Sequence, residues 1–382
     1  MKILLIGGAG FIGSHTAQKL LLLGHSPVVF DSFDPQIHGT EGLPHVAELA
    51  KCMPVIKGDT RDRDALERVF GETDAIYYFP ASTGTGQSMY RVGEYSDVNV
   101  HGAGIFGDLL LKYRSRIARV VVSSSRAVYG EGAAMCTEHG RVFPKGRNNA
   151  DMESGFFDSR CPQCGNRVEP LPSLETDAVG PVSVYGITKL AQEMIVANVA
   201  EAAGIPSVVF RYQNVYGPGQ SLKNPYTGIL SIFTQLLLGK KAINVFEDGL
   251  PTRDFVYVGD VVEYNVRALT CADAKGLVLN VGTGVRKTVD DLVKALGRVL
   301  SVNPDSFISG DFRLGDIRHA VADTTQLFKK LGSLEFTSLD AGVHSFASWV
   351  VSQHLSSEAN STFQHSLDEM RRAGLLRSAS PS

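Results

Sequence analysis

A glycine-rich loop between a short apolar run and a helical pattern constrains the fold of this chain most strongly. The run Lys2–Ile6 ends directly at Gly7, and glycines at positions 7, 10 and 13 form a G-x-x-G-x-x-G pattern that opens the helical stretch Phe11–Leu23. One glycine permits a tight turn, one lets the backbone approach a pyrophosphate, and one lets helix and strand pack closely. The order strand, loop, helix predicts a dinucleotide-binding unit that uses Gly7, Gly10, Phe11, Ile12 and Gly13.

Further apolar runs, rich in β-branched residues, alternate with helix-period stretches through the first 210 residues. Such near-continuous runs are typical of parallel strands covered on both faces, with crossover helices between them. They predict an α/β fold with a Rossmann-type doubly wound parallel sheet. The expected strands are Lys2–Ile6, Pro27–Asp31, Met53–Gly58, Ala75–Phe79, Arg119–Ser123 and Ser207–Arg211.

Composition excludes several classes of protein. The 382 residues include 43% hydrophobic and 20% charged residues, and 37 basic against 40 acidic residues give a net charge of −3. A large core can form, and there is no basic field for nucleic acid or for a membrane surface. No stretch approaches the roughly 20 apolar residues of a membrane span, and the apolar start is too short for a signal peptide. We expect a cytoplasmic protein without nucleic-acid or membrane partners.

Changes in the strand–helix pattern along the chain suggest its division into domains. The strand–helix pattern breaks between Gly130 and Ser183, where Gly, Pro, Arg and Asn are frequent, and it changes to longer loops after Arg211. The Ser-rich end holds one expected helix, Ser361–Ala373, and is otherwise expected to be frayed. We predict a dinucleotide-binding domain at 1–210 with an insertion at 131–182, a return of 250–282 to that domain, a smaller lobe from 211–249 and 283–350, and a tail at 355–382.

Acidic residues at the ends of two strands indicate which cofactor binds. Asp31 lies 18 residues after Gly13 and can accept hydrogen bonds from both hydroxyls of an adenosine ribose. The next two residues are Ser32 and Phe33, and neither is an arginine that could accommodate a 2′-phosphate, so NAD is favoured over NADP. Asp59, after the third run, could reach the adenine amino group or could cap a helix.

A tyrosine and a lysine four residues apart provide a catalytic pattern. Tyr185 and Lys189 share one face of the expected helix Val182–Gly204. An ammonium beside a phenol favours the phenolate and lowers the pKa of the phenol. The spacing alone is a weak signal, but the hydroxyl of Ser125 at the end of the fifth strand could share the same proton network.

Together these residues make the chain resemble the extended short-chain dehydrogenase/reductase family, within its NAD-dependent nucleotide-sugar epimerases and dehydratases. The resemblance covers about residues 1–350. It includes the glycine loop, Asp31, Asp59, Phe79-Pro-Ala81, Asn99, Ser-Ser-Ser-Arg-Ala-Val-Tyr-Gly (123–130), the Tyr/Lys pair, Arg211-Tyr-Gln-Asn-Val-Tyr-Gly-Pro-Gly219, Gly249-Leu-Pro-Thr-Arg-Asp-Phe-Val256 and Arg313-Leu-Gly-Asp-Ile-Arg-His319.

The resemblance implies roles for individual residues. Ser125, Tyr185 and Lys189 would form the catalytic triad. The nicotinamide would lie near Tyr212 and Val215, and further cofactor contacts would come from Thr60, Phe79, Ala81, Asn99 and Ser123. The sugar-nucleotide diphosphate would be held by Asn214, Arg253 and Arg313, which suits the pairing of guanidinium groups with phosphate. Ser88 and Asp316 would complete the substrate contacts.

The resemblance also narrows the reaction. Dehydratases of the family carry an Asp-Glu pair after the catalytic hydroxyl residue, and this chain has Arg126 and Ala127 there. Elimination is therefore disfavoured, and epimerisation at C4 through a 4-keto sugar is expected. The whole pattern, with the segment 83–90 before Asn99, most resembles the dTDP-L-rhamnose 4-epimerase branch. The alternatives are another nucleotide-sugar reaction, such as 4,6-dehydration or keto-sugar reduction, and a non-catalytic NAD-sensing regulator.

The insertion carries a candidate metal site. Cys136-x-x-His139 is followed, after 21 residues, by Cys161-x-x-Cys164. Two chelating pairs can form a tetrahedral Cys3His zinc site, and four protein ligands leave no open position, so the zinc would be structural. A metal could also supply folding energy that this Gly- and Pro-rich segment lacks. Unligated thiols and a redox-active Cys161–Cys164 pair remain as alternatives.

Two long helices indicate an assembly. Val98–Arg114 and Val182–Gly204 correspond to helices that relatives pair into a four-helix dimer interface. They carry more apolar residues than packing on one sheet face needs, so we expect a homodimer. The residues are Val100, Ile105, Leu109, Ile187, Leu190, Met194 and Ile195.

Overall fold

The computed structural model describes residues 1–39, 44–222, 224–226, 228–273, 275–353 and 359–380. Within these residues the largest sheet has seven parallel strands in the order β14-β9-β5-β4-β1-β2-β3. This order is that of a doubly wound sheet, and it confirms the predicted fold class. The strands are β1 (Lys2–Ile6), β2 (Ser26–Asp31), β3 (Val55–Lys57), β4 (Ala75–Tyr78), β5 (Arg119–Ser125), β9 (Ser207–Tyr212) and β14 (Leu277–Val281).

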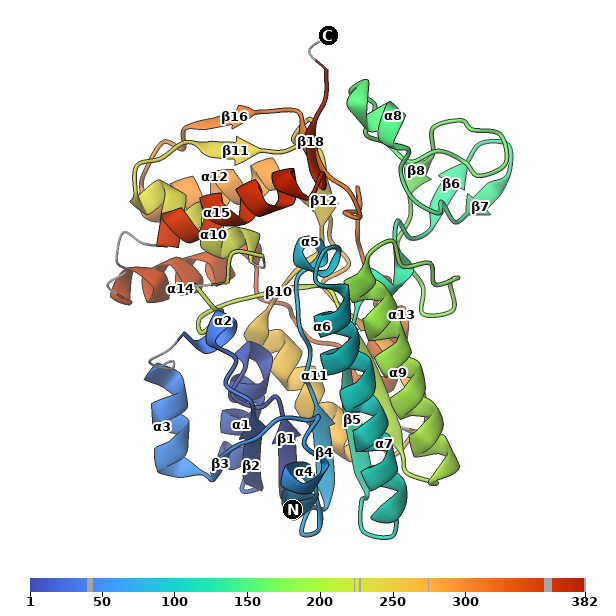
Figure 1. The fold of residues 1–382 in the computed structure, drawn as a ribbon, viewed down its shortest axis with the longest axis vertical. Coiled ribbons are helices and arrows are strands. Elements are labelled where there is room, and N and C mark those ends of the chain that lie inside the picture. Colours follow the sequence, from blue (N-terminus) through green and yellow to red (C-terminus); the bar gives the residue numbers. More distant parts are fainter. Residues whose placement is uncertain (40–43, 223, 227, 274, 354–358, 381–382) are drawn as a thin grey trace.

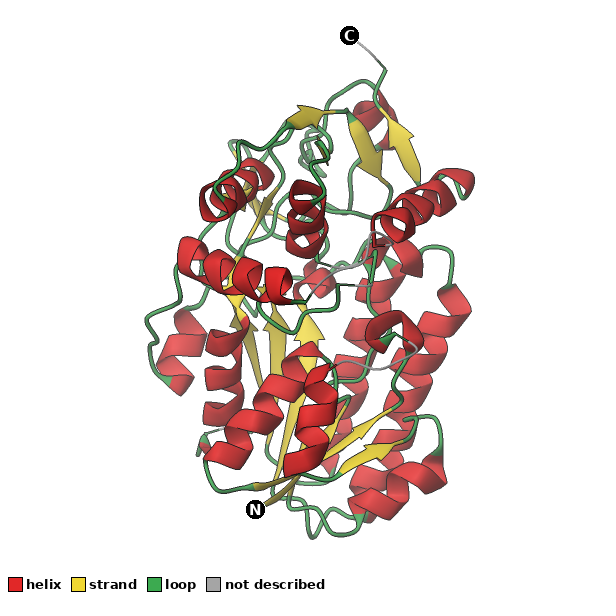
Figure 2. Cartoon of the chain, turned by 90° about the vertical axis from the view of Figure 1, so that its left-hand side faces the viewer, coloured by secondary structure: helices red, strands yellow, loops and turns green. Residues whose placement is uncertain are grey.

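Helices cover both faces of this sheet (Figures 1 and 2). Successive residues of β1 point to opposite faces, so Ile3 and Leu5 lie in one buried cluster and Leu4 and Ile6 in another. The first face packs against α1 (Phe11–Leu22) and α11 (Val258–Thr270), and the second against α4 (Arg63–Phe70), α7 (Gly102–Lys112) and α9 (Val184–Ala202). Burial on both faces explains the continuous apolar runs in the sequence.

The glycine loop has the geometry that its sequence predicts. Gly7 has a φ of +72°, which favours glycine. A Cβ atom at Gly13 would lie 2.6 Å from the carbonyl oxygen of Gly7, so only glycine lets α1 approach β1 this closely. The N-terminus of α1 therefore lies close to the carboxyl end of β1.

A second, smaller lobe lies beyond the carboxyl ends of the strands (Figure 1). Its core contains Phe233, Leu292 and Phe346 from three helices. Its elements are β10 (Asn214–Tyr216), α10 (Ile229–Leu238), β11 (Ile243–Val245), β12 (Thr252–Arg253), β13 (Phe255–Tyr257), β15 (Lys287–Thr288), α12 (Val289–Leu300), β16 (Ser306–Ile308), β17 (Asp311–Arg313) and α14 (Leu339–Ser352).

The end of the chain is ordered where it was expected to be frayed. Helix α15 (Ala359–Arg372) is followed by β18 (Leu376–Ser378), which pairs antiparallel with β17, Arg313 opposite Leu376. Leu367, Met370 and Leu376 are buried together, so apolar contacts hold the tail against the lobe. The frayed end is therefore a wrong prediction for 376–378, while residues 354–358 lie outside the described part.

The insertion forms a small module beside the lobe (Figure 1). It contains β6 (Ala134–Cys136), β7 (Gly140–Val142), α8 (Asn149–Glu153) and β8 (Glu169–Pro170), with β6 between β7 and β8. Its buried cluster is small and includes Cys136 and Cys161.

The remaining helices are short or connect strands. They are α2 (Pro35–His38), α3 (Pro44–Cys52), α5 (Thr85–Ser88), α6 (Val92–Ser96), the π-helical turn η1 (Asp97–His101), the 3-10 turn η2 (Arg126–Tyr129) and α13 (Thr325–Leu331). In the part of the chain that is described, none of the helices has the length and hydropathy of a membrane span.

Candidate active site

A cavity of about 830 Å³ lies between the carboxyl ends of the strands and the smaller lobe. Ligands of doubly wound sheets bind at this edge, where the strand order reverses. The sequence-predicted cofactor residues that line the cavity are Gly7, Gly10, Phe11, Ile12, Gly13, Asp31, Asp59, Thr60, Phe79, Ala81, Ser123, Tyr185, Lys189, Tyr212 and Val215. The predicted substrate residues that line it are Ser125, Asn214, Arg253, Arg313 and Asp316.

Two predicted site residues lie outside this lining. Ser88 is fully buried; its hydroxyl donates to the carbonyl of Thr85 and accepts from the backbone N–H of Tyr185 at 3.0 Å. Asn99 is also fully buried, and its side chain bonds the backbone of Ser82 and the hydroxyl of Thr188. The structure thus places both as supports of residues that reach the cavity.

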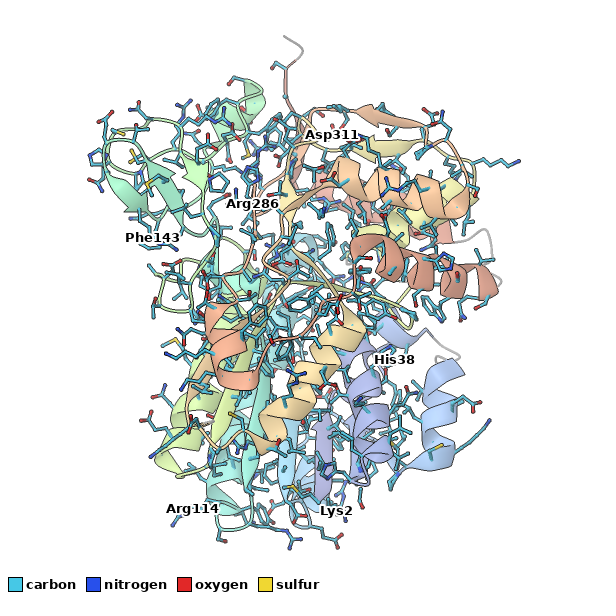
Figure 3. All side chains as sticks on the ribbon, turned by 180° about the vertical axis from the view of Figure 1, so that it is seen from behind. Lys2, His38, Arg114, Phe143, Arg286 and Asp311 are labelled. Atoms are coloured by element: carbon cyan, nitrogen blue, oxygen red, sulfur yellow. The ribbon has the colours of Figure 1, made fainter. Side chains whose placement is uncertain are left out.

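Asp31 joins the glycine loop to the end of β2. Its carboxylate accepts hydrogen bonds from the backbone N–H groups of Ala9 and Phe33, both at 3.0 Å. The buried His38 places Nε2 3.6 Å from the same carboxylate. Figure 3 shows His38 at the junction of the sheet and the smaller lobe. This histidine was missed at the sequence level because nothing in its spacing relates it to the glycine loop.

Asp59 lies at the same end of the cavity with a partner of its own. The Arg61 side chain donates to its carboxylate at 2.6 and 2.9 Å and lowers the pKa of Asp59. Asp59 does not cap the following helix, because Asp62 accepts from the N–H of Ala65 at the start of α4.

The glycine-loop end of the cavity fits NAD. Gly10, Phe11 and Ile12 at the N-terminus of α1 line the cavity, and no side chain of the described residues caps this end of the helix. The carboxylate of Asp31, an acceptor for ribose hydroxyls, lines the same cavity. The neighbouring cation Arg61 is engaged by both Asp59 and Asp97.

The three predicted catalytic residues all line the cavity, and Ser125 lies within hydrogen-bond reach of Tyr185. Ser183 caps α9 by accepting from the N–H of Gly186, which places Tyr185 in the first turn. Burial raises the pKa of Tyr185, and a hydrogen bond with Ser125 and the positive charge of Arg126 act in the opposite direction. The phenol therefore lies where its ionisation depends on these two neighbours.

Lys189 has a different environment from the one its spacing suggested. Its Nζ donates to the carbonyl of Ser123 at 2.6 Å and to Oε1 of Gln192, and the side chain is buried. Desolvation lowers the pKa of Lys189 to about 7. The cation that acts on the pKa of Tyr185 is Arg126, whereas the sequence pattern assigned this effect to Lys189.

The other end of the cavity is rich in arginine. Arg126 Nε donates to Asn214 Oδ1 at 3.0 Å, and Arg253 donates to Asp316 at 3.1 Å. The Arg313 guanidinium lies over the ring of Phe246, and its buried Nε has no hydrogen-bond partner among the described residues. Desolvation lowers the pKa of both Arg126, to about 10, and Arg313. Three guanidinium groups with one carboxylate form a site that fits a diphosphate.

Further lining residues were missed at the sequence level. Arg126 was identifiable from the sequence, since it directly follows Ser125. At this position, only the absence of the dehydratase acid entered the prediction. The aromatic residues come from the lobe and the tail, and no motif indicated them. They are Tyr226, Phe233, Phe246 and Phe363.

The four predicted metal ligands come together in the insertion. Cys136 Sγ lies 3.6 Å from His139 Nδ1 and 3.7 Å from Cys164 Sγ, and Cys161 Sγ lies 3.6 Å from the same nitrogen. All four ligand atoms lie within 4.8 Å of one another. A zinc tetrahedron with Zn–S bonds of about 2.3 Å has S–S edges of about 3.8 Å. A hydrogen bond from the backbone of Glu138 helps to lower the pKa of Cys136 to about 6.

Comparison with known families decides the classification. The model of the NAD dependent epimerase/dehydratase family matches residues 3–147 and 161–282, which is more than half of the chain. The chain belongs to this family. The match confirms the predicted family and its class of reaction, an NAD-dependent epimerase of nucleotide sugars. Residues 148–160, between the two matched parts, lie in the insertion.

Individual relatives agree with this classification. The chain is 34% identical to dTDP-L-rhamnose 4-epimerase of Burkholderia thailandensis, with 92% of this chain and 95% of that protein covered. It is similar to the structure of UDP-glucose 4-epimerase from Thermotoga maritima with UDP-glucose, with a TM-score of 0.75, 28% identity and coverage of 92% and 99%. It is also similar to MoeE5 in complex with UDP-glucuronic acid and NAD, with a TM-score of 0.73, 26% identity and coverage of 92% and 100%.

Proposed function

We propose that this member of the epimerase family inverts the C4 centre of a nucleoside-diphosphate sugar through a 4-keto sugar. The observation that carries the proposal is the placement of Ser125 and Tyr185 between two ends of one cavity, a glycine-loop end that fits NAD and an arginine end that fits a diphosphate. When bound, NAD would accept a hydride from C4 and return it to the opposite face of that carbon, once the 4-keto sugar has turned in the cavity.

Each residue near Tyr185 has a chemical task in this proposal. The Tyr185 phenolate removes the proton of the C4 hydroxyl and later returns it, and Ser125 donates a hydrogen bond to the same oxygen. The pKa of Lys189, about 7, lets this side chain gain or lose a proton near neutral pH. Its hydrogen bond to the carbonyl of Ser123 fixes the end of β5. Arg253 and Arg313 hold the diphosphate, which leaves the sugar beside Tyr185.

The substrate that we propose first is a dTDP-linked 6-deoxyhexose. The support is the 34% identity to a dTDP-L-rhamnose 4-epimerase over almost the whole chain. Elimination is disfavoured because Arg126 stands directly after Ser125, at the place where dehydratases have an acid.

The test is incubation of the purified protein with dTDP-, UDP- and GDP-sugars, with NMR as the readout of C4 configuration. A C4-inverted product, formed by the wild type and absent with Tyr185→Phe, is the expected result. A 4-keto product that absorbs after alkali would instead identify a dehydratase. NAD binding with no turnover of any sugar would favour a regulator.

The insertion is proposed to hold a structural zinc ion. The four ligand atoms of Cys136, His139, Cys161 and Cys164 have the separations of a tetrahedral site, and they leave no position for a substrate. The described cysteines are all free of disulfides. Thiolate ligands need a reducing compartment, so we also propose a cytoplasmic location.

A homodimer through α7 and α9 completes the proposal. Ile187 and Met194 on α9 are 53% and 55% exposed, and both lie on one face of this helix. Leu109 differs from expectation, since it is fully buried in the core beneath α7 and cannot reach a partner. Val100, Ile105, Leu190 and Ile195 are partly exposed.

A further inference from the structure

We infer that the Cys/His insertion positions the arginine end of the cavity, so that metal binding by the insertion strengthens binding of a nucleoside diphosphate. In this arrangement Arg147 and Asp158 are positioning residues, since neither is placed to touch the substrate. The inference rests on the proposed function of Arg253 and Arg313 as diphosphate ligands, and it gives the insertion a role beyond its own folding.

The first link joins the metal ligands to Asp158. Asp158 lies three residues before Cys161, in the segment that leads into the second ligand pair. Backbone hydrogen bonds tie this segment across the ligand loop, from Val168 to Ser159 and from Cys161 to Asn166. The carboxylate of Asp158 also accepts from Arg167 on the returning strand. The position of Asp158 therefore depends on the closure of the Cys161-x-x-Cys164 loop.

The second link is a buried ionic network between the insertion and the lobe. Arg147 is 2% exposed and donates to Glu247 at 2.8 Å and to the carbonyl of Phe157 at 3.3 Å. Arg318, also buried, donates to Asp158 at 3.1 Å and to Glu247 at 2.7 Å. Buried charges of this kind need every partner in place, because a lost partner leaves an uncompensated charge.

Glu131 closes this network from the start of the insertion. Its carboxylate accepts from the hydroxyl of Ser159 at 3.0 Å and from the backbone N–H of Arg318 at 3.1 Å. Ring contact between Phe157 and Phe312, with centroids 6.2 Å apart, adds an apolar connection next to Arg313. The insertion therefore contacts the segment 312–318 through both polar and apolar groups.

The third link runs from that segment to the diphosphate ligands. Arg147 Nη2 donates to the backbone carbonyl of Asp316 at 3.1 Å. From the other side Arg253 donates to Asp316 Oδ1 at 3.1 Å and to the carbonyls of Ile317 at 2.9 Å and Arg318 at 3.0 Å. Asp316 and Arg318 thus hold Arg253 on their cavity side and are held by the insertion on their far side. Loss of the metal would release that far side.

The test measures binding rather than turnover. Calorimetry with dTDP, UDP and GDP on the full-length protein, zinc-loaded and after chelation, gives Kd for the arginine end, and NAD gives Kd for the glycine-loop end. We expect chelation to weaken dTDP binding by about tenfold, within the usual range of coupling between sites, and to leave NAD binding within about twofold. Linkage is reciprocal, so saturating dTDP should raise the affinity of the protein for zinc by the same factor.

Variants separate positioning from folding. Arg147→Met should weaken dTDP binding while zinc content and NAD affinity stay unchanged, and Arg147→Lys should restore part of the loss. The matched control is Arg141→Met on the same insertion, where the arginine is exposed and its guanidinium donates to Asp177 and to the carbonyl of Pro172, away from the network of Arg147. This control should bind dTDP as the wild type does. Arg253→Ala should weaken dTDP binding whatever the metal state.

The outcomes are distinguishable. Equal dTDP affinity with and without zinc, or unchanged affinity in Arg147→Met, would overturn the inference and leave the proposed function intact. A purified protein that binds no zinc would overturn it as well. Wild-type protein that binds none of dTDP, UDP and GDP would remove the proposed function together with the inference. Parallel losses of dTDP and NAD binding would indicate general unfolding and would also contradict it.

Discussion

Tyr185 is the residue on which the proposed chemistry depends, and burial alone would keep its phenol protonated. Ser125 and Arg126 counter that effect on its pKa from within the cavity. A side chain in this position can exchange a proton with a bound hydroxyl, because it is desolvated and has neighbours that favour its anion.

Tyr185→Phe should abolish epimerisation and leave folding and NAD binding nearly unchanged. Phenylalanine keeps the ring but cannot accept the substrate proton, so the rate should fall roughly 10²–10⁴-fold, or about 3–5 kcal/mol of barrier. Ser125→Ala should cost less, since it removes one hydrogen bond and no base. Turnover is measured by NMR. A Tyr185→Phe enzyme with more than about a tenth of the wild-type rate would rule out the phenol as the base.

Arg126→Gln should move the ascending limb of the pH profile of kcat/KM to higher pH. The positive charge of Arg126 lowers the pKa of Tyr185, so its removal raises that pKa, and more hydroxide is needed to form the phenolate. Arg126→Lys keeps a cation beside the phenol and should stay closer to the wild type. A profile that does not move with Arg126→Gln would show that another cation, such as Lys189, controls the ionisation.

Asp31→Ala should weaken NAD binding and narrow the preference for NAD over NADP. The carboxylate is the expected acceptor for the ribose hydroxyls, and loss of such charged hydrogen bonds costs about 1.5–3 kcal/mol. It also holds the N–H of Ala9, so Asp31→Asn is the control that keeps an acceptor for the loop. Calorimetry gives both affinities. Equal wild-type affinity for the two cofactors would contradict the assignment.

At the scale of elements, the insertion is a segment with a small hydrophobic core whose folded state a metal ion could stabilise. Its buried cluster is small and includes the proposed ligands Cys136 and Cys161, so cross-linking through a metal would replace the apolar burial that the insertion lacks. Cys161→Ser should release zinc and lower the Tm, by about 2–4 °C for each kcal/mol lost.

Metal analysis and calorimetric melting check this prediction about the insertion. Cys52→Ser is the matched control, because Cys52 is exposed on α3 and far in sequence from the ligand pairs. Its zinc content and Tm should equal those of the wild type. A Cys161→Ser protein with full zinc content and an unchanged Tm would show that this thiol is not a ligand.

At the scale of the whole molecule, the exposed face of α9 is the surface that the proposed dimer would cover. Ile187→Asp combined with Met194→Asp should convert the dimer to a monomer, because a charge buried between subunits is not compensated. Light scattering at micromolar concentration gives the mass. Leu22→Asp is the control, since Leu22 is 83% exposed on α1, on the other face of the sheet. A wild-type monomer would contradict the proposal.

Much of the sheet domain was predictable because its signals are local. The bounds of β1 and α1 match their predicted ranges within one residue, since apolar runs and the glycine loop are read within a few neighbouring residues. The Cys/His spacing likewise predicted which four side chains come together. The motif at 123–130 and the Tyr/Lys pair indicated Ser125, Tyr185 and Lys189, and all three line the cavity.

Only the tertiary structure decided the surroundings of those residues. It showed Ser88 and Asn99 as supports behind the cavity, Lys189 bonded to Ser123, and Arg126 as the cation acting on Tyr185. It also paired the chain end with β17, at Arg313. Such contacts join residues that are far apart in the sequence, and their energies depend on burial and on partners from other elements. Local patterns carry no information on either.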